Sequence, residues 1–272
     1  MNEHPTTPII TLTTDFGLKD SYVASLKGVI LGIHPHARIV DITHLISPHN
    51  IVEAAFTLMC TYPYFPEGTI HVAVIDPGVG SHRKAICVTG DNRIFLGPDN
   101  GVLWLCSQRL SNFSTYQIDN HALFTASPSY TFHGRDIFAP VAAHLALGMR
   151  AQELGGPVAR IQSLNLPQPI VNNDAIEGTV LHIDSFGNIL TNIHRSHLAH
   201  FDTDQRQYII HIGQITFTGI SQTYAEQRMG ETFALFSSSD FLEIATRERS
   251  VAALLGAHIG QAVVLKRSIR NG

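Results

Sequence analysis

Strand-like and helix-like segments alternate along the first half of the chain, and this alternation restricts the available folds more than any other feature. Strand signals lie at 8–17, 37–43 and 69–76, where β-branched and small apolar residues run together. Helix signals lie at 20–35, 50–66 and 134–148, each next to or containing a proline. Such alternation predicts a mainly parallel sheet that helices cover on both faces.

Two further segments of the first half carry specific expectations. Residues 84–106 predict a hairpin around Asp91-Asn92, followed by a helix capped near Asp99 or Asn100. Pro140 lies inside the helical segment 134–148, so we expect a kink or an early start there.

The second half has a different pattern. Residues 164–175 are rich in proline and asparagine and predict a linker. Short β-branched runs separated by turns follow, and only Ser250–Leu255 indicates a helix among them. We therefore expect an α/β fold in which an N-terminal α/β sandwich domain, residues 1–165, precedes a smaller antiparallel β-barrel domain, residues 166–272.

Composition excludes several classes of partner. The net charge is −4 and no run of Lys and Arg occurs, which argues against nucleic acid as a ligand. The apolar runs are too short to span a bilayer, and the first residues lack the basic and apolar regions of a signal peptide. We therefore expect a cytoplasmic protein without a membrane partner. The three cysteines, Cys60, Cys87 and Cys106, are expected to be buried thiols.

Polar clusters follow three of the predicted strands, at 13–17, 41–44 and 76–81. Ligands of open parallel sheets bind beyond the carboxyl ends of the strands, where a carboxylate can hold two ribose hydroxyls. Asp15 and Asp41 could instead only cap the turns that follow them. The stretch "VAVIDPGVGSHR" is the most informative, because a turn needs its glycines and proline but not Asp76 or Arg83.

The stretch "TFHGRDIFAP" (131–140) places a histidine and an acid at the start of a helix. Asp136 could simply favour the positive end of that helix. A metal site is the alternative, built from His121, His133, Asp136 and His144, although their spacing matches no common zinc signature.

The second half contains two candidate ligand loops. In "DSFGNILTNI" (184–193), Phe186 is either plain core or a platform for a planar ring whose edge Asn188 contacts. In "LFSSSDFLEIA" (235–245), three consecutive hydroxyls indicate a turn or another ligand edge.

Together, "TLTTDFGLKDSYVASLKGVI", "DPGVGSHRKAI", "GPDNGVL", "FHGRDIFAPVAA" and "DSFGNILTNI" closely resemble the S-adenosyl-L-methionine (SAM) hydroxide adenosyltransferase family, which is related to SAM-dependent halogenating enzymes. The resemblance runs from Ile9 to about Arg267. It implies an N-terminal α/β domain, a C-terminal barrel and a homotrimer. Each ligand would lie between the N-terminal domain of one subunit and the C-terminal domain of the next.

The resemblance also implies site residues. The catalytic trio falls at Asp76, Arg83 and His133, and Asp15 matches the aspartate that holds the ribose diol. Residues around the methionine and adenine moieties match Asp184, Phe186 and Asn188, and a second C-terminal loop matches Ser238 and Ser239. His49 is a departure, because relatives usually have a large aromatic side chain near the sugar at this position.

The expected reaction is attack of water or hydroxide on C5′ of SAM, which yields adenosine and L-methionine without a metal or another cofactor. The intact "DPGVGSHR" favours water over a halide as the nucleophile. Three alternatives remain open at this stage: a SAM-dependent halogenase, a SAM- or adenosine-binding module without turnover, and a metal hydrolase built on the histidines.

Overall fold

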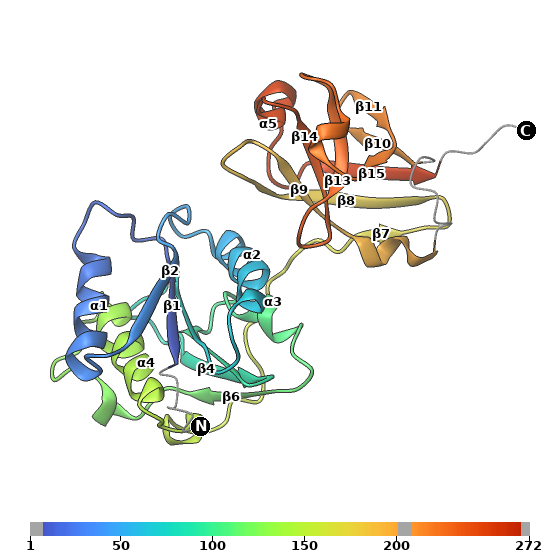
Figure 1. Ribbon diagram of the computed structural model, residues 1–272. Helices are drawn as coiled ribbons and strands as arrows, with labels where there is room; N and C mark the ends of the chain where they lie inside the picture. Colours follow the sequence, from blue (N-terminus) through green and yellow to red (C-terminus); the bar gives the residue numbers. More distant parts are fainter. Residues whose placement is uncertain (1–7, 201–207, 268–272) are drawn as a thin grey trace, which may run out of the picture. The chain divides into compact units, whose positions relative to one another are not determined.

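The computed structural model describes residues 8–200 and 208–267. Tertiary contacts divide the chain into two compact units, residues 1–164 and 165–272. Figure 1 shows helices and strands mixed in the N-terminal unit, whereas strands dominate the C-terminal unit.

The N-terminal unit is built on a six-stranded sheet with the order β2-β1-β3-β5-β4-β6. The strands are β1 (Ile9–Thr14), β2 (Arg38–Thr43), β3 (Ile70–Val74), β4 (Ala85–Gly90), β5 (Arg93–Pro98) and β6 (Phe113–Gln117). The neighbours β2, β1, β3 and β5 run parallel, while β4 is antiparallel to both β5 and β6. The predicted mainly parallel sheet is confirmed.

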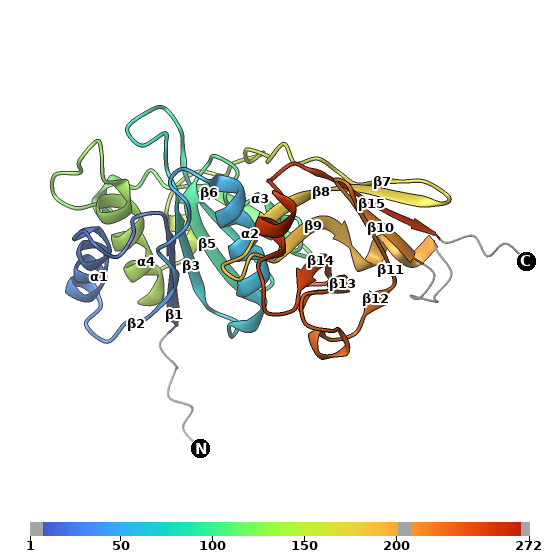
Figure 2. The ribbon, with the colours of Figure 1, turned by 90° about the horizontal axis from the view of Figure 1, so that it is seen from above.

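Helices lie on both faces of this sheet, as predicted. They are α1 (Tyr22–Ile33), α2 (Ile51–Thr61), α3 (Trp104–Ser107) and α4 (Ala139–Ala146). Figures 1 and 2 show α1 and α4 together on one side of the sheet and α2 and α3 together on the other. Short 3-10 turns occupy Tyr62–Tyr64, His121–Leu123 and Ala151–Glu153, the first of them where Pro63 follows α2.

One core joins the sheet to α1 and α4. Leu26 and Ile30 of α1 and Phe138 before α4 pack with Leu12 and Val72 of the sheet, and all five side chains are fully buried. Burial of each such side chain stabilises the fold by about 1.5–3 kcal/mol. The ends of β1 and β3 therefore project from a closely packed base.

The helix expected after the β4–β5 hairpin is shorter and starts later than predicted. The prediction of a cap near Asp99 or Asn100 was wrong, because Leu103 precedes the helix and both predicted side chains make long-range hydrogen bonds. Asn100 Nδ2 donates to Ile75 O (2.8 Å), and Asp99 Oδ1 accepts from Gln162 N (2.7 Å). The helix α3 begins only at Trp104.

The segment expected as a helix over 134–148 starts as a π-helical turn, Gly134–Phe138, and continues as α4. In place of the expected kink or early start, the π-helical turn comes first and Pro140 lies in the first turn of α4. Proline has no N–H to donate, so the α-helical hydrogen bond to Asp136 O cannot form. Thr125 N donates to that carbonyl oxygen instead (3.1 Å).

The C-terminal unit is a nearly closed sheet with the order β11-β10-β15-β8-β9-β14-β13-β12, and β7 pairs with β8. The bounds are β7 (Ile170–Val171), β8 (Ala175–Ile183), β9 (Ile189–His194), β10 (Tyr208–Ile212), β11 (Ile215–Thr218), β12 (Ile220–Ser221), β13 (Thr232–Phe236), β14 (Phe241–Thr246) and β15 (Ala262–Arg267). Only Gly219 separates β11 from β12, so the two outer strands of the sheet are joined in sequence. The predicted barrel is thus present as a nearly closed sheet.

Three details complete this unit. The predicted linker 164–175 contains the short strand β7, and β12 pairs parallel with β13 in an otherwise antiparallel ladder. The predicted helix is present as α5 (Val251–Leu255), where Ser250 Oγ accepts from Ala253 N (3.1 Å). Within residues 8–200 and 208–267, no helix is both long and apolar enough to cross a bilayer.

Candidate functional site

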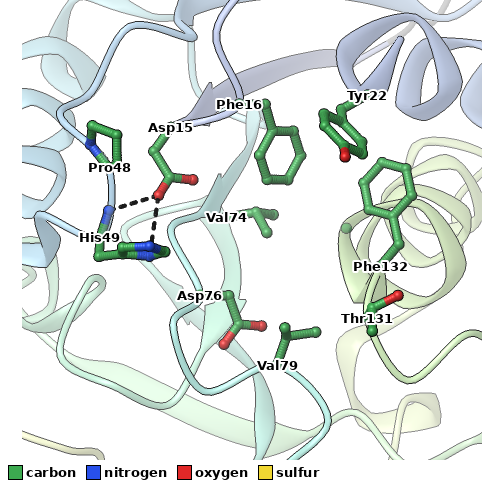
Figure 3. Close-up of a pocket in the computed structure, with 11 residues that line it drawn as sticks. Asp15, Phe16, Tyr22, Pro48, His49, Val74, Asp76, Val79, Thr131 and Phe132 are labelled. Atoms are coloured by element: carbon green, nitrogen blue, oxygen red, sulfur yellow. Dashed lines mark hydrogen bonds and ion pairs between the residues drawn. The ribbon is translucent and has the colours of Figure 1, made fainter. Parts of the chain in front are cut away.

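The three polar clusters of the N-terminal unit lie at one edge of the sheet. Because β2, β1 and β3 are parallel neighbours, the residues after each strand share the carboxyl edge. A pocket of about 260 Å³ opens there, which we call the strand-end pocket (Figure 3). It is lined by Asp15, Phe16, Tyr22, Pro48, His49, Val74, Asp76, Val79, Thr131, Phe132 and Gly134.

Asp15 lies on one wall of the strand-end pocket, and its side chain is 10% exposed. Its Oδ2 accepts a hydrogen bond from His49 N (2.8 Å), and His49 Nδ1 is 4.0 Å from the same oxygen. Figure 3 shows the other carboxylate oxygen pointing away from His49, toward the Phe16 side of the pocket. That oxygen is placed to accept hydrogen bonds from a ligand.

His49 is held in a backbone conformation that side chains rarely adopt, with φ at +65°. Asn50 follows it and caps α2, since Asn50 Oδ1 accepts from Glu53 N (3.1 Å). The strained residue thus turns its N–H toward Asp15, while its imidazole remains 73% exposed. The backbone of His49 holds Asp15, and its ring faces the pocket opening.

Three aromatic rings form the opposite wall, and our sequence reasoning assigned none of them to the site. Phe16, Tyr22 and Phe132 are mutual neighbours, with ring centroids 5.3–5.8 Å apart (Figure 3). Phe16 directly follows Asp15, and Phe132 directly precedes His133. This closeness to motif residues was the signal available in the sequence. Tyr22 carried no such signal, because its spacing places it on the predicted apolar face of α1.

Asp76, Arg83 and His133 form one hydrogen-bonded cluster. Arg83 Nε donates to Asp76 Oδ1 (2.9 Å), and Arg83 Nη2 forms an ion pair with Asp76 Oδ2. Arg83 Nη2 also lies 2.6 Å from His133 Nδ1. The side chains of Arg83 and Asp76 are only 10% and 6% exposed, so solvent screens this pair weakly.

The contact with Arg83 determines the protonation of His133. A guanidinium group only donates, so His133 Nδ1 must accept, and the neutral ring carries its proton on Nε2. Burial and the charge of Arg83 lower the pKa of His133, against the opposing effects of Asp76 and Asp136. The expected role of His133 as a proton acceptor therefore requires the ring to leave Arg83.

The cluster separates two pockets. Asp76 lines the strand-end pocket, while His133 lines a neighbouring pocket of about 380 Å³ together with Gly80, Ser81, His121, Phe124, Pro128, Ser129, Tyr130 and Ile137. Among the described residues, the hydrogen bonds of the Arg83 guanidinium come from Nε and Nη2. Its Nη1 makes no hydrogen bond to a residue of the described part of the chain.

In the C-terminal unit, Asp184 organises the turn between β8 and β9. Its Oδ1 accepts from Phe186 N (2.9 Å) and Asn188 N (2.8 Å), and its Oδ2 accepts from Asn188 Nδ2 (3.2 Å). The Phe186 ring projects from this turn and is 78% exposed. The three predicted residues line one pocket of about 680 Å³ with Tyr224, Thr246, Arg247, Glu248, Arg249 and Ser250.

Ser238 and Ser239 lie elsewhere in that unit. They belong to the β13–β14 turn, where Ser239 N donates to Ser237 Oγ (3.3 Å). Phe241, just after this turn, pairs with His194 at the end of β9, whereas Asn188 precedes the start of β9. Neither serine lines the pocket of Asp184, Phe186 and Asn188.

A buried acid lies close to that pocket and had no signal in the sequence. Glu243 is 4% exposed and accepts a hydrogen bond from the Tyr224 hydroxyl. Burial raises the pKa of Glu243, and the nearby charge of Asp184 acts in the same direction, while the Tyr224 hydrogen bond opposes it. Burial and Glu243 also raise the pKa of Tyr224. The side chains of Asp184, Glu243 and Tyr224 therefore influence one another electrostatically.

Across the described part of the chain, no three His, Cys, Asp or Glu side chains gather as they would around a metal ion. His121 packs edge-on against Phe124. Asp136 is committed to Arg135, Thr125 and Ser129.

Comparison with known proteins identifies both halves of the chain. The sequence profile of the SAM hydroxide adenosyltransferase N-terminal domain matches residues 10–155, and that of the C-terminal domain matches residues 178–264. Two curated relatives are each named (R)-S-adenosyl-L-methionine hydrolase. The protein from Salinispora arenicola is 43% identical over 67% of this chain and 71% of its own length. The protein from Methanocaldococcus jannaschii is 37% identical over 91% of both chains.

Structural comparison agrees. A crystal structure of an uncharacterized conserved protein from Thermotoga maritima superimposes with a TM-score of 0.90 at 35% identity, over 95% of this chain and 100% of that one. A fluorinase from an Actinoplanes species is a more distant relative, 26% identical over 96% of this chain and 98% of its own length.

Proposed function

Because the chain belongs to the SAM hydroxide adenosyltransferase family, we propose that it hydrolyses SAM to adenosine and L-methionine. Water, activated as hydroxide, attacks C5′ of the ribose. The observation that carries this proposal is the Asp76–Arg83–His133 cluster, whose Asp76 lines the strand-end pocket together with Asp15.

The reaction is a displacement in which the charge of the substrate is lost. The water oxygen forms a bond to C5′, the C5′–sulfur bond breaks, and its electron pair returns to sulfur. Methionine thus leaves as a neutral thioether and needs no acid. The proton of the attacking water passes to the solvent, so the positive charge of the sulfonium is balanced by one released proton.

The main difficulty is to supply hydroxide near neutral pH, since bulk water has a pKa of about 15.7. We assign to Arg83 the task of stabilising the anion through its Nη1 donors, in a site where solvent screening is weak. Asp76 orients Arg83 through two contacts and accepts a hydrogen bond from the water. His133 fixes the remaining Nη2 donor, so the guanidinium plane cannot rotate away from the nucleophile.

Substrate binding is assigned to residues of both units. Asp15 would hold the ribose diol, with the ring of His49 over the sugar and the aromatic wall of Phe16, Tyr22 and Phe132 beside it. The turn of Asp184, Phe186 and Asn188 would contact the adenine and methionine moieties. The family resemblance adds Ser238 and Ser239, and a homotrimer in which each site takes its two parts from different subunits.

The relatives' names specify the (R) configuration at the sulfonium sulfur. We extend this preference to the present chain. Sulfur is bonded to the attacked carbon. Inversion at sulfur therefore changes the direction of the methionine chain, and the pocket would fit the two epimers differently. A mixture of both epimers would therefore lose the (R) form first, which chiral chromatography measures directly.

No metal or cofactor is part of the proposal, because a sulfonium is already a good leaving group and needs no Lewis acid. Activity should thus persist in the presence of a chelator. Neither nucleic acid nor a membrane is proposed as a partner. We also propose a cytoplasmic location, for which the buried thiols of Cys87 and Cys106 are favourable, since thiols stay reduced there.

The experiment that tests the function is product identification with purified protein and SAM. Adenosine and methionine in equal amounts support hydrolysis. A 5′-halo-5′-deoxyadenosine formed with chloride would assign the protein to the halogenating relatives. Tight binding of SAM without any product would assign it to a binding module.

A further inference from the structure

Asp136 is a buried charge that the proposed reaction does not use. Its side chain is 1% exposed. Thr125 Oγ1 donates to its Oδ1 (3.0 Å), Ser129 N donates to its Oδ2 (2.8 Å), and Arg135 Nε donates to Oδ1 (2.7 Å). Burial opposes the charge, but the hydrogen bonds from Arg135, Ser129 and Thr125 outweigh it and lower the pKa of Asp136.

The backbone of Asp136 binds the same segment. Pro140 stands four residues later and leaves Asp136 O without its helical donor. Thr125 N fills that position at 3.1 Å. Asp136 therefore holds residues 125–129 with its carbonyl and its carboxylate at once.

This segment continues into the candidate site. We call residues 125–133 the His133 loop. Thr131 and Phe132 line the strand-end pocket, whereas Tyr130 and His133 line the neighbouring pocket. Any displacement of the loop would thus move walls of both pockets together with His133.

The His133 loop also packs closely on the turn that begins at Asp76. A Cβ atom at Gly80 would lie 2.5 Å from Tyr130 O, so only glycine permits this approach. Gly80 also has φ at +78°, a conformation that favours glycine. The loop is therefore fixed on one side by Asp136 and rests on the other side against the turn after β3.

We propose that Asp136 is a positioning residue, which holds the His133 loop against the Asp76–Ser81 turn and thereby sets the contact between Arg83 and His133. This inference rests on the proposed function. It differs from a simple effect of charge on the helix, since the hydrogen bonds to the carboxylate come from Thr125, Ser129 and Arg135 among the described residues. None of these three donors is a first-turn N–H of α4.

Two variants test it. Asp136→Asn keeps the size of the side chain but replaces one acceptor oxygen by a donor that faces other donors. Pro140→Ala restores an N–H that competes with Thr125 for Asp136 O, and alanine is a good helix former. Glu153→Gln is the matched control, because Glu153 is a surface acid paired with Arg150 in the same unit.

We expect both variants to lower kcat by about 10- to 100-fold with KM within about threefold, because misplaced catalytic groups affect the transition state more than binding. Glu153→Gln should leave both constants unchanged. Folded Asp136→Asn with the kcat of the wild type would overturn the inference, even if its melting temperature falls. If Asp136→Asn does not fold, Pro140→Ala decides by the same criterion.

Hydrogen exchange of peptides from 125–133 provides a reading that does not depend on turnover. Exchange in this segment should be faster in both variants than in the wild type and in Glu153→Gln. Unchanged exchange would contradict the anchoring role of Asp136. If the wild type itself makes no adenosine, the proposed function fails, while the exchange data still report whether Asp136 holds the loop.

Discussion

At the scale of single residues, the proposed reaction depends on how Arg83 distributes its donors. Nε and Nη2 are committed to Asp76 and His133, and our proposal assigns Nη1 to the nucleophile. Asp76 and His133 therefore have different tasks, although both contact the same guanidinium. Asp76 orients the cation and reaches the strand-end pocket, whereas His133 limits its rotation from the other side.

Substitution of the cluster should separate catalysis from binding. We expect Asp76→Ala, Arg83→Ala and His133→Ala each to lower turnover, by about 10²–10³-fold for Arg83, as for loss of an oxyanion donor. The SAM dissociation constant from calorimetry should change little. Arg150→Ala is the control, because Arg150 forms an exposed ion pair with Glu153. Wild-type rates in all three variants would refute the catalytic assignment.

The pH dependence tests the protonation of His133. Its pKa is lowered below the ordinary 6.5, so the folded protein keeps the ring neutral at pH 6.5 and loses activity only as the pH falls further. Protonated Nδ1 can no longer accept from Arg83. Since the unfolded chain takes up this proton already near 6.5, stability also decreases as the pH falls below that value.

His133→Asn sharpens the same test, because an amide oxygen can accept from Arg83 but does not titrate. This variant should retain more activity than His133→Ala and lose the acid limb of the pH–rate profile. If His133→Asn and His133→Ala are equally inactive, His133 would instead be favoured as the proton acceptor, acting after its ring has moved away from Arg83.

At the scale of elements, the turn after β3 requires glycine for its close approach to the His133 loop. Gly80→Ala should destabilise the fold by more than about 1 kcal/mol. Alanine is strained at a positive φ, and its Cβ would also clash with Tyr130 O. Gly28→Ala is the matched substitution within α1, where an added Cβ meets nothing within 4 Å. It should stabilise the fold by about 0.5–1 kcal/mol.

Urea denaturation of both glycine variants measures these differences. A Gly80→Ala protein as stable as the wild type would show that the loop and the turn can separate without cost. The contact between Arg83 and His133 would then need another explanation.

The sequence predicts regular elements well and irregular turns poorly. β1, β3 and the hairpin at Asp91-Asn92 follow from local pattern, because β-branched runs and positive-φ residues act within a few positions. The late start of α3 does not, since Asn100 is committed to Ile75 O, a contact made only after folding. The π-helical turn before Pro140 depends likewise on Thr125, a residue 11 positions before Asp136.

At the scale of the whole molecule, the proposed site divides its residues between the two units. The cluster of Asp76, Arg83 and His133 belongs to the N-terminal unit, and the Asp184 turn belongs to the C-terminal unit. In the sequence, only a family resemblance connects these residues, since nothing local relates positions so far apart. Tyr22 and Glu243 have no such signal, because their surroundings arise only from tertiary packing.

The proposed homotrimer makes a prediction about mixed assemblies. Asp76→Ala and Phe186→Ala should each be inactive or impaired alone. Co-expressed with different tags and purified together, they should regain activity, because some sites then combine two unaltered halves. Two Asp76→Ala subunits with different tags are the control. Failure of the mixed assemblies to exceed the sum of the parents would contradict a site shared between subunits.

The most direct test of the central claim is to incubate the protein with SAM in oxygen-18 water and to analyse the products by mass spectrometry. We expect adenosine that carries the label at its 5′ oxygen, together with unlabelled methionine. Adenosine without the label, or a label found only on the amino-acid product, would contradict water attack at C5′ by the Asp76–Arg83–His133 cluster.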